Sequence, residues 1–472
     1  MYTVSRINEN NTIMQIQVIQ ENLLSDLTTP VSLYLKLRER YAEVLLLESS
    51  DYSSKENSLS FLCFDSLATL EVKAGMAKTI DHTNGQSHSA QADDVVSTIT
   101  SFVDRFETDT QLPYSGVFGY TSFDAVQYFD TLQLNTDKPQ YGTPDIRYDF
   151  FRFVIVFDHF YERMTVIEHL PAGDESSMGK VLNIVRKQDS QTYYFRAADE
   201  LEYNMSDQDF MNIVTACKTE CQLGNVFQIV PSRRFSKSFS GDEFNVYRAL
   251  RSINPSPYLF YFDYGAYKIF GSSPEAQIIV KGGIAEIHPI AGTFKRTGDA
   301  ELDAKQAAAL AADPKENAEH TMLVDLARND LSKNTREVHV EKLKEVQYFS
   351  HVIHLTSVVK GKLCEGVSGY QILADTFPAG TLSGAPKYRA LELIDRMEPT
   401  ARGYYGGGLG MIGLNGDINH AIMIRSFVSE GGKLHCQAGA GIVIDSDEQR
   451  EMEEVTNKLA ALMQALKLAE TL

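Results

Sequence analysis

The stretch Ser272–Gly298, SSPEAQIIVKGGIAEIHPIAGTFKRTG, predicts two antiparallel strands joined by a tight turn. The turn falls at Gly282-Gly283, where both residues can adopt the positive φ angles that a two-residue hairpin requires. Apolar and polar residues alternate on either side of the glycines, which is typical of a half-buried strand pair. Glu275 places a carboxylate at one end of the hairpin, and Ala291-Gly292-Thr293 places small groups at the other. A core hairpin with polar ends is the simplest interpretation of this stretch.

Length, composition and charge limit the classes of protein to which the chain can belong. Its 472 residues are too many for one small core, and 43% hydrophobic with 23% charged residues is ordinary for a globular protein. The net charge of −19 argues against nucleic acid or an anionic membrane as the main partner, because both attract basic patches. An anionic ligand would therefore need a metal ion or local basic side chains.

Cysteine usage and the N-terminal sequence predict a cytoplasmic protein. The five cysteines are scattered, and Cys217 and Cys221, one helical turn apart, lack further ligands at metal spacing. No apolar run approaches the length of a membrane span, and the polar start MYTVSRINENN does not resemble a signal peptide. We therefore expect a reducing compartment and no membrane.

The sequence patterns predict two regions, residues 1–195 and 205–470, with a weakly periodic seam at 187–204. Both regions mix strands and helices without repeats. The polar stretch 84–94 is expected to be a loop, and Asn254-Pro255-Ser256-Pro257 a rigid turn that joins two strands. The expected fold class is therefore α/β of the α+β type, in which antiparallel β-sheets form a sandwich flanked by helices.

Two predicted helices of the second region each carry two glutamates three residues apart, Glu316 with Glu319 and Glu451 with Glu454. Glu316 can serve instead as a capping-box residue, and Glu454 can pair with a lysine four residues later. Glu319 and Glu451 lie on or beside apolar stripes, where unpaired carboxylates are costly. Carboxylates on two helices favour a shared hard cation, Mg²⁺ rather than zinc. A di-iron bundle is the rival interpretation, but it needs Glu-x-x-His motifs on four helices.

Glycine-rich stretches of the second region differ in what they predict. Gly408–Gly413 matches the dinucleotide-binding fingerprint, but an Asn-Gly turn and a second strand follow it where a helix is required. Gly380–Lys387 resembles a phosphate loop only superficially, because its proline removes an amide that the cradle needs. Gly439 and Gly441 allow close approach of a ligand to the backbone. Arg425 ends an apolar strand and suits a carboxylate better than solvent.

Six motifs follow one another along the chain: SSPEA, PIAGT, ENAEHTMLVDLARNDL, FPAGTLSGAPK, GYYGGGLGMIG and QAGAGIVIDS. In this combination they resemble the chorismate-utilising enzymes, and most closely the branch of anthranilate synthase component I. The resemblance is strong over residues 205–465 and continues into the first region through LLLESS and GVFGYTSFDAVQYFD. It implies a lyase that converts chorismate and ammonia to anthranilate and pyruvate, the first committed step of tryptophan biosynthesis.

The resemblance also implies roles for the glutamates. Glu319 and Glu454 would hold the Mg²⁺ that clamps the ring carboxylate of chorismate, supported through water by Glu316 and Glu451. Glu275 would be the general acid that protonates the departing ring hydroxyl while ammonia adds to the ring. A cation between an acidic protein and a dianionic substrate would answer the problem that the net charge poses.

Further site residues are implied in the same way. His354 would assist removal of a ring proton as pyruvate leaves and the ring becomes aromatic. Gly292 and Thr293 would line the ring. The enolpyruvyl side chain and its carboxylate would be bound by Tyr405, Arg425, Gly439 and Gly441.

Two positions separate the activities within the family. Aminodeoxychorismate synthases typically carry a nucleophilic lysine where this chain has Ala291. Isochorismate and salicylate synthases typically carry a lysine base where this chain has Gln228, which is expected at the catalytic site. Since neither lysine is present, the resemblance implies that ammonia is the nucleophile. The alternatives are an aminodeoxychorismate synthase component I of the folate pathway and a non-catalytic relative that senses tryptophan.

The resemblance implies a partner and an inhibitor. No part of the chain resembles a glutaminase, so the family's component II, a glutamine amidotransferase, would supply ammonia from glutamine in a heterodimer or heterotetramer. Feedback inhibition by tryptophan would use a second set of residues. The set comprises Glu48, Ser49, Asn254, Pro255, Ser256, Pro257, Tyr258 and Leu259. Leu259 replaces the family's methionine, a change that conserves volume, so we expect the tryptophan site to persist.

Overall fold

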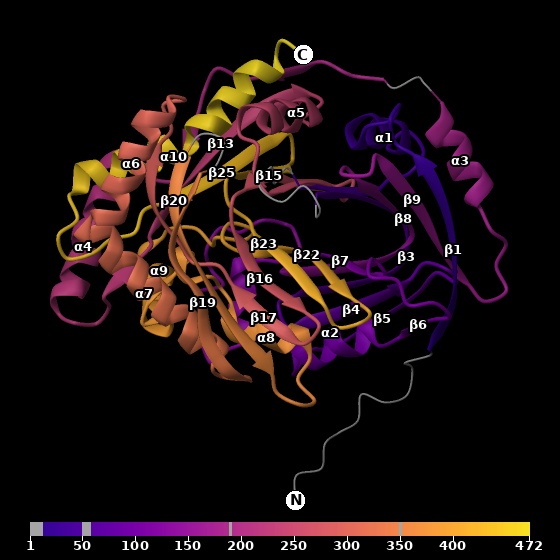
Figure 1. The fold of residues 1–472 in the computed structure, drawn as a ribbon, viewed down its shortest axis with the longest axis horizontal. Coiled ribbons are helices and arrows are strands. Elements are labelled where there is room, and N and C mark those ends of the chain that lie inside the picture. The colour runs from indigo at the N-terminus through magenta and orange to yellow at the C-terminus, as the bar shows by residue number, and fades with distance from the viewer. Residues whose placement is uncertain (1–12, 50–57, 188–190, 349–351) are drawn as a thin grey trace, which may run out of the picture.

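Antiparallel strands organise the molecule and confirm the predicted fold class (Figure 1). The computed structural model describes residues 13–49, 58–187, 191–348 and 352–472. The helices are α1 Pro30–Leu37, α2 Val95–Val103, α3 Met178–Arg186, α4 Asp207–Gln222, α5 Phe244–Ile253, α6 Ala300–Ala312, α7 Pro314–Leu331, α8 Gly369–Thr376, α9 Lys387–Met397 and α10 Glu448–Ala469. Two 3₁₀ turns are η2 Phe123–Tyr128 and η3 Gly380–Leu382.

The strands fall along the whole chain. Those of the first region are β1 Met14–Leu24, β2 Val44–Glu48, β3 Leu59–Lys73, β4 Met76–Asp81, β5 Gln86–Gln91, β6 Phe106–Thr108, β7 Gly116–Thr121, β8 Ile146–Asp158 and β9 Arg163–Pro171. Those that follow are β10 Phe195–Ala197, β11 Glu202–Tyr203, β12 Gln228–Ile229, β13 Ser232–Gly241, β14 Tyr258–Asp263, β15 Tyr267–Ser273, β16 Ala276–Lys281, β17 Ile284–Ile287, β18 Ile290–Lys295, β19 Thr335–Tyr348, β20 Val352–Leu363, β21 Gly384–Ala385, β22 Gly408–Gly413, β23 Ile418–Ile422, β24 Ser426–Glu430 and β25 Lys433–Gly439.

The hairpin predicted at Gly282-Gly283 forms between β16 and β17. Both glycines have positive φ, 57° and 77°, as a two-residue turn that matches the strand twist requires. Lys281 pairs with Ile284 across the turn. The fingerprint-like stretch Gly408–Gly413 is strand β22 and pairs with β23 through the Asn-Gly turn, so the rejection of a dinucleotide site there is confirmed.

Strand pairing joins the two predicted regions into a closed circuit of ladders. β2 pairs with β14, and β7 pairs with β22, so that each region supplies neighbours to the other. Two backbone hydrogen bonds join the bend between β15 and β16 to the bend between β23 and β24. Ser272 N donates to Arg425 O at 3.1 Å, and Ile422 N donates to Glu275 O at 3.0 Å. The division at 195–205 stays a prediction about the sequence, whereas the backbone pairing makes the two regions structurally continuous.

Two local predictions are wrong. Within 84–94, Gln86–Gln91 forms β5, which pairs with β4 although its sequence has no apolar alternation. The Asn254–Pro257 turn does not join two strands, because Phe244–Ile253 folds as α5 and the turn leads from this helix into β14. The seam at 187–204 also contributes β10 and β11, both of which pair with β13.

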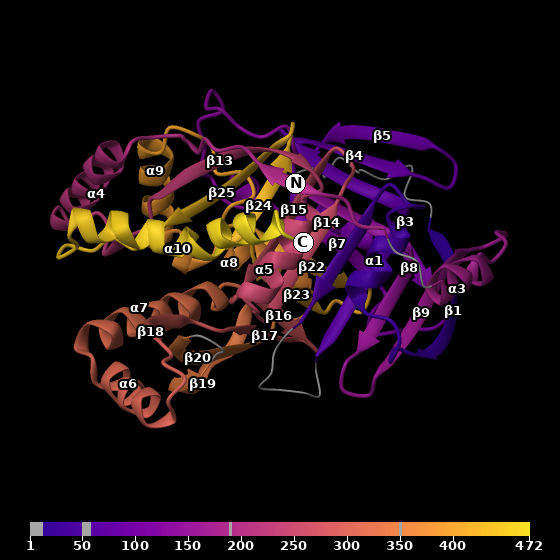
Figure 2. The same ribbon diagram turned by 90° about the horizontal axis from the view of Figure 1, so that it is seen from above.

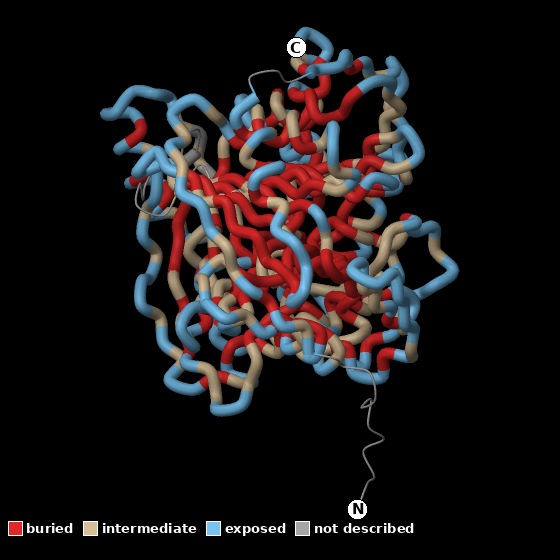
Figure 3. Tube along the Cα trace, turned by 90° about the vertical axis from the view of Figure 1, so that its right-hand side faces the viewer, coloured by how far each residue is buried: buried red, intermediate tan, exposed pale blue. Residues whose placement is uncertain are grey.

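One end of the molecule carries two groups of helices, whereas α1 and α3 lie at the other end (Figure 2). α6 and α7 lie with β18, β19 and β20, whereas α4, α9 and α10 form the other group. Figure 3 shows the buried strands running through the interior with exposed segments outside them. Asp447 caps α10 by accepting from Arg450 N at 3.0 Å. None of the helices in the described part of the chain has the length and apolar character needed to cross a bilayer.

Candidate active site

Glu275 lies at the bend between β15 and β16. Its Oε1 accepts a hydrogen bond from Thr381 Oγ1, on η3, at 3.1 Å. Burial raises the pKa of Glu275 to about 7, against the lowering effects of the Thr381 hydrogen bond and two nearby positive charges. A carboxyl group that keeps its proton near neutral pH can act as a general acid.

Arg425 lies at the facing bend, between β23 and β24, with the unusual φ of 49°. Within the described residues its guanidinium makes no hydrogen bond or ion pair, although the side chain is largely buried. Burial lowers the pKa of Arg425, and the neighbouring Glu275 carboxylate opposes this shift. A desolvated guanidinium without a partner is costly, so this group is suited to bind an anion.

His354, on β20, lies close enough to Arg425 to feel its charge. Its Nδ1 lies 2.6 Å from the carbonyl oxygen of Gly292, which holds the ring by a hydrogen bond that the Nδ1–H donates. Burial lowers the pKa of His354, and the charge of Arg425 lowers it further. The imidazole is therefore neutral near pH 7, and the tautomer with Nδ1–H leaves Nε2 as the basic nitrogen.

Gly292 requires the absence of a side chain. Its φ is +68°, and a Cβ built there would lie 2.6 Å from Leu310 Cδ1 and 3.0 Å from Glu316 Oε2. The ladder between β18 and β20 also shifts register between Ala291 and Phe294. The Thr293 side chain lies outside the described residues, so its predicted role stays a prediction. Ala291 is buried and presents no amine to the site.

Gln228, on β12, connects a second group of predicted residues. Its Nε2 donates to Glu319 Oε1, on α7, at 3.3 Å. A Cβ at Gly441 would lie 2.5 Å from the same Nε2, so a side chain there would displace the amide of Gln228. Since Glu316 and Glu319 share one face of α7, this group adjoins the one around Gly292.

Tyr405 and Gly439 form the third group. The Tyr405 hydroxyl accepts from the Gly439 N–H, and burial raises the pKa of this phenol. Lys458 Nζ, on α10, donates to Gly439 O at 2.8 Å and also pairs with Glu454 at 2.8 Å. Because the charge of Lys458 lowers the pKa of Glu275, the three groups surround a common region.

The predicted metal ligands fit Mg²⁺ by donor type but form no assembled cluster. Glu316 and Glu319 line the region from α7, while α10 contributes Glu451, 8% exposed, and Glu454, exposed and paired with a lysine. Carboxylate oxygens are the ligands that Mg²⁺ prefers. Over residues 13–49, 58–187, 191–348 and 352–472, no three His, Cys, Asp or Glu side chains lie close enough to hold a metal ion. The ligand roles stay predictions.

The residues predicted to bind tryptophan also come together. Glu48, at the end of β2, pairs in register with Leu259 on β14. Its Oε2 accepts from Tyr247 OH at 2.6 Å and from Arg251 Nε at 3.0 Å. Asn254 Nδ2 lies 3.4 Å from Ser272 Oγ, three residues before Glu275 in the chain. The remaining members of the set are Ser49, Pro255, Ser256, Pro257 and Tyr258, all next to these residues in the chain.

Sequence patterns missed two polar residues of this region. Thr381 lies in the glycine-rich stretch Gly380–Lys387. The sequence argues against a phosphate loop there, and it offers no other role for this threonine. The sequence predicts Lys458 only as a surface partner for Glu454, whereas in the structure its Nζ donates to the backbone carbonyl of Gly439. A polar residue within an otherwise apolar and glycine-rich run was the one available signal for Thr381.

Comparison with known proteins identifies the family to which the chain belongs. Residues 54–464 match the sequence model of the family described as chorismate binding enzyme. Anthranilate synthase component 1 of Aquifex aeolicus (strain VF5) is 36% identical, with 99% of this chain and 97% of that protein covered. The protein of the same name from Pseudomonas putida is 35% identical, with 95% and 94% covered.

A solved structure agrees with the sequence relatives. The crystal structure of anthranilate synthase component I from Streptococcus pneumoniae TIGR4 aligns with a TM-score of 0.77 at 32% identity and covers 94% of this chain and 99% of that one. A menaquinone-specific isochorismate synthase from Escherichia coli, 18% identical, has the same fold with a TM-score of 0.74 over 96% of this chain and 95% of its own. The chain therefore belongs to the chorismate-binding enzymes and, among them, to the family of anthranilate synthase component 1.

Proposed function

We propose that the chain converts chorismate and ammonia to anthranilate and pyruvate, as a lyase of tryptophan biosynthesis. The observation that carries this proposal is the nearness of Glu275, whose pKa burial raises to about 7, to Arg425, a largely buried guanidinium that makes no hydrogen bond or ion pair within the described residues. The first can donate a proton to a leaving hydroxyl group, and the second can bind a carboxylate of a dianionic substrate.

The chemistry divides among the residues of the site. Arg425 binds the carboxylate of the enolpyruvyl group, beside Tyr405 and Gly439. Glu275 gives its proton to the ring hydroxyl, which leaves as water while the nitrogen of ammonia forms a bond to the ring. Neutral His354 then accepts a ring proton through Nε2 as the bond to the enolpyruvyl oxygen breaks and pyruvate leaves. The product ring is aromatic, which drives the second step.

Incubation of the purified chain with chorismate, Mg²⁺ and an ammonium salt tests the proposal. Fluorescent anthranilate is the expected product. A non-aromatic amino compound that only a separate lyase converts to p-aminobenzoate would favour aminodeoxychorismate synthase, although the buried Ala291 offers no lysine for that reaction. Saturable tryptophan binding without turnover would favour a non-catalytic sensor.

The pH dependence of kcat is expected to report the proton of Glu275. Because the acid must be protonated and burial raises its pKa to about 7, kcat should fall as pH rises through about 7. Lys458→Met should move this fall to higher pH, since the charge of Lys458 lowers the pKa of Glu275. A pH profile that stays flat from 6 to ~8.5 in the native chain would contradict the role of Glu275 as acid.

Mg²⁺ is the proposed cofactor, held by Glu319 and Glu454 with support from Glu316 and Glu451. When bound, it would neutralise the ring carboxylate of chorismate. We expect Glu319→Gln to raise the Mg²⁺ concentration for half-maximal activity by about 10–100-fold, because an amide binds a hard cation less well than a carboxylate. Metal binding measured by calorimetry should weaken in parallel. Glu453→Gln, on the exposed face of α10, is the matched control, and equal effects of both changes would refute the assignment.

Feedback inhibition by tryptophan is proposed at the set around Glu48 and Asn254. Ser49→Arg should raise the tryptophan concentration for half inhibition by about tenfold or more, equivalent to ~1.4 kcal/mol, because a long charged side chain would occupy the site. Activity without tryptophan should stay within the native range. Ser87→Arg, on the exposed strand β5, is the control, and undiminished inhibition in the Ser49 variant would place the inhibitor elsewhere.

The proposed partner is a glutamine amidotransferase subunit, anthranilate synthase component II, in a heterodimer or heterotetramer. The names of the relatives support a component 2. We also propose a cytoplasmic location, since all five cysteines, among them the buried Cys63, Cys217 and Cys436, are free thiols. Ammonium salt should replace glutamine in the isolated chain, whereas glutamine should serve only when the partner is present.

A further inference from the structure

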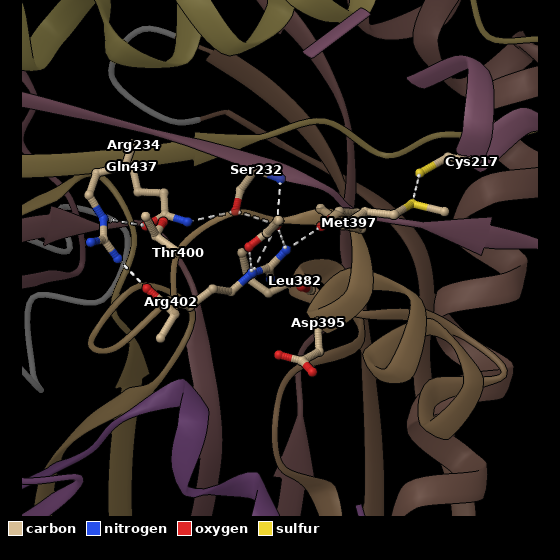
Figure 4. A network of polar contacts seen from close by, with 12 residues as sticks. Cys217, Ser232, Arg234, Leu382, Asp395, Met397, Thr400, Arg402 and Gln437 are labelled. Atoms are coloured by element: carbon tan, nitrogen blue, oxygen red, sulfur yellow. Dashed lines mark hydrogen bonds and ion pairs between the residues drawn. The ribbon is translucent and has the colours of Figure 1, made fainter. Parts of the chain in front are cut away.

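A buried ion pair joins Glu398 to Arg402. Figure 4 shows Arg402 among the polar side chains around it. Glu398 is 3% exposed and Arg402 is 2% exposed. Arg402 Nη2 donates to Glu398 Oε1 at 2.5 Å, and Nε donates to Oε2 at 3.0 Å. The two-point geometry fixes the plane of the guanidinium.

Arg402 uses its remaining donors to hold two other segments. Nη1 donates to Leu382 O, on η3, at 2.7 Å, and Nη2 donates to Val230 O at 2.6 Å. The guanidinium also stacks on Phe123, with Cζ 4.5 Å from the ring centroid. Val230 N in turn donates to Ser383 O at 3.0 Å, so the two held segments are bonded to each other. A lysine could not make these contacts together, because it lacks the planar fork.

Glu398 extends the network to a third segment. Its Oε1 accepts from both the N–H and the hydroxyl of Ser232, each at 2.8 Å. Gln437 Nε2 donates to the same hydroxyl at 2.7 Å (Figure 4). Ser232 pairs in register with Gly439, whose N–H contacts Tyr405. The carboxylate therefore holds the start of β13, which pairs with the strand β25 that presents this glycine.

The network reaches Leu382, which is next in the chain to Thr381, the hydrogen-bond partner of Glu275. Thr381 precedes Leu382, whose carbonyl Arg402 holds, and Thr381 Oγ1 donates to Glu275 Oε1. We propose that Glu398 and Arg402 are positioning residues, which fix η3 so that the Thr381 hydroxyl stays bonded to the general acid Glu275. This inference rests on the proposed function only in calling Glu275 the acid.

Stability alone gives no reason to keep this pair. Hydrophobic side chains of similar volume can replace a buried ion pair without loss of stability, because the desolvation of both charges offsets their attraction. What such side chains cannot do is hold the carbonyl groups of Leu382 and Val230 at fixed points. The geometry of η3 is thus the property that Arg402 determines.

Charged groups from several elements face Glu275, and the network should alter one contact among them. Arg425 comes from the bend after β23, Lys458 from α10 and the Thr381 hydroxyl from η3. The charges of the first two lower the pKa of Glu275, and so does the hydrogen bond of the third. If η3 moves, the Thr381 bond is lost while both charges remain, so Glu275 should hold its proton to higher pH.

Arg402→Lys tests the proposal. We expect kcat to fall by about 10–100-fold, as for a misplacement of about 1 Å, with less change in KM for chorismate. The fall of kcat at high pH should move to higher pH, as in Thr381→Val. In the double variant the two effects should not add, because both remove the same hydrogen bond. Arg38→Lys, at the mostly buried Arg38–Asp242 pair away from the site, is the matched control and should leave the pH profile unchanged.

An infrared measurement that does not depend on turnover distinguishes failure of the positioning role from failure of the proposed function. The infrared carbonyl band of protonated Glu275, identified by its loss in Glu275→Gln, should disappear at higher pH in Arg402→Lys than in the native chain. A native chain that makes no anthranilate but shows this displacement would refute the proposed function and leave the positioning role intact. An unmoved band, or full additivity with Thr381→Val, would overturn the positioning role. Retention of native properties in Glu398→Gln would contradict it as well.

Discussion

Replacing Glu275 with glutamine is expected to lower kcat for anthranilate formation by about 10²–10⁴-fold, the contribution typical of a positioned general acid. Glutamine has the same shape and can still accept from Thr381, but it carries no acidic proton for the leaving hydroxyl. KM for chorismate should change little, because Arg425 remains. Steady-state fluorescence assays over a range of pH measure both constants, and circular dichroism checks the fold.

Glu286→Gln provides a matched control on the same hairpin. Glu286 lies on β17, where hydrogen bonds from His288 and Lys360 lower its pKa to about 2 despite partial burial. Burial instead raises the pKa of Glu275, so the two carboxyl groups differ in protonation at neutral pH. We expect Glu286→Gln to leave kcat near the native value. Equal losses in both variants would mean that the hairpin, and not the acid, had been damaged.

Replacing Arg425 with methionine should raise KM for chorismate by roughly 10–150-fold, equivalent to about 1.5–3 kcal/mol for a hydrogen bond between charged groups. The buried guanidinium has no partner in the described part of the chain, so its binding capacity is available to a substrate carboxylate. Methionine fills similar space without charge. Equilibrium binding of chorismate without ammonia should weaken by the same factor.

Arg328→Met is the control for loss of one arginine charge, since Arg328 lies on the exposed side of α7 and its ion pair with Asp325 is open to solvent, where such pairs contribute little. Its KM should match that of the native chain. If the Arg425 variant instead lost kcat at unchanged KM, the guanidinium would act on the transition state alone and not on the bound substrate.

Local sequence patterns sufficed for much of the fold. Capping residues such as Ser206 and Asp447 and the turn at Gly282-Gly283 are read from short windows. Helix α5 was missed although Phe244, Tyr247 and Leu250 recur at helical spacing, because its neighbours are strand-like. No window of the sequence could reveal that β2 pairs with β14, since that contact joins segments about 200 residues apart and depends on tertiary packing.

The residues of the site also differ in whether the sequence alone could identify them. The glutamates and glycines stood out because carboxylates on apolar faces and glycines at fixed positions are unusual in themselves. Arg402 did not, because arginine is common on surfaces, and its burial with Glu398 appears only when the segment after α9 contacts Val230 and Ser232. The Thr381 contact with Glu275 depends on two segments 106 residues apart. Residues that position others thus need the tertiary structure to be recognised.

The closed circuit of ladders has a consequence for how the chain could have evolved. Because β2 pairs with β14 and β7 pairs with β22, the second region could not stand alone without exposing the edges of β14 and β22. Unpaired edges of that kind recruit other chains, so selection would act against any intermediate that separated the halves. The residues predicted to bind tryptophan and the proposed acid Glu275 lie on segments joined through the pair Tyr258–Ser273, so we expect them to have been inherited together.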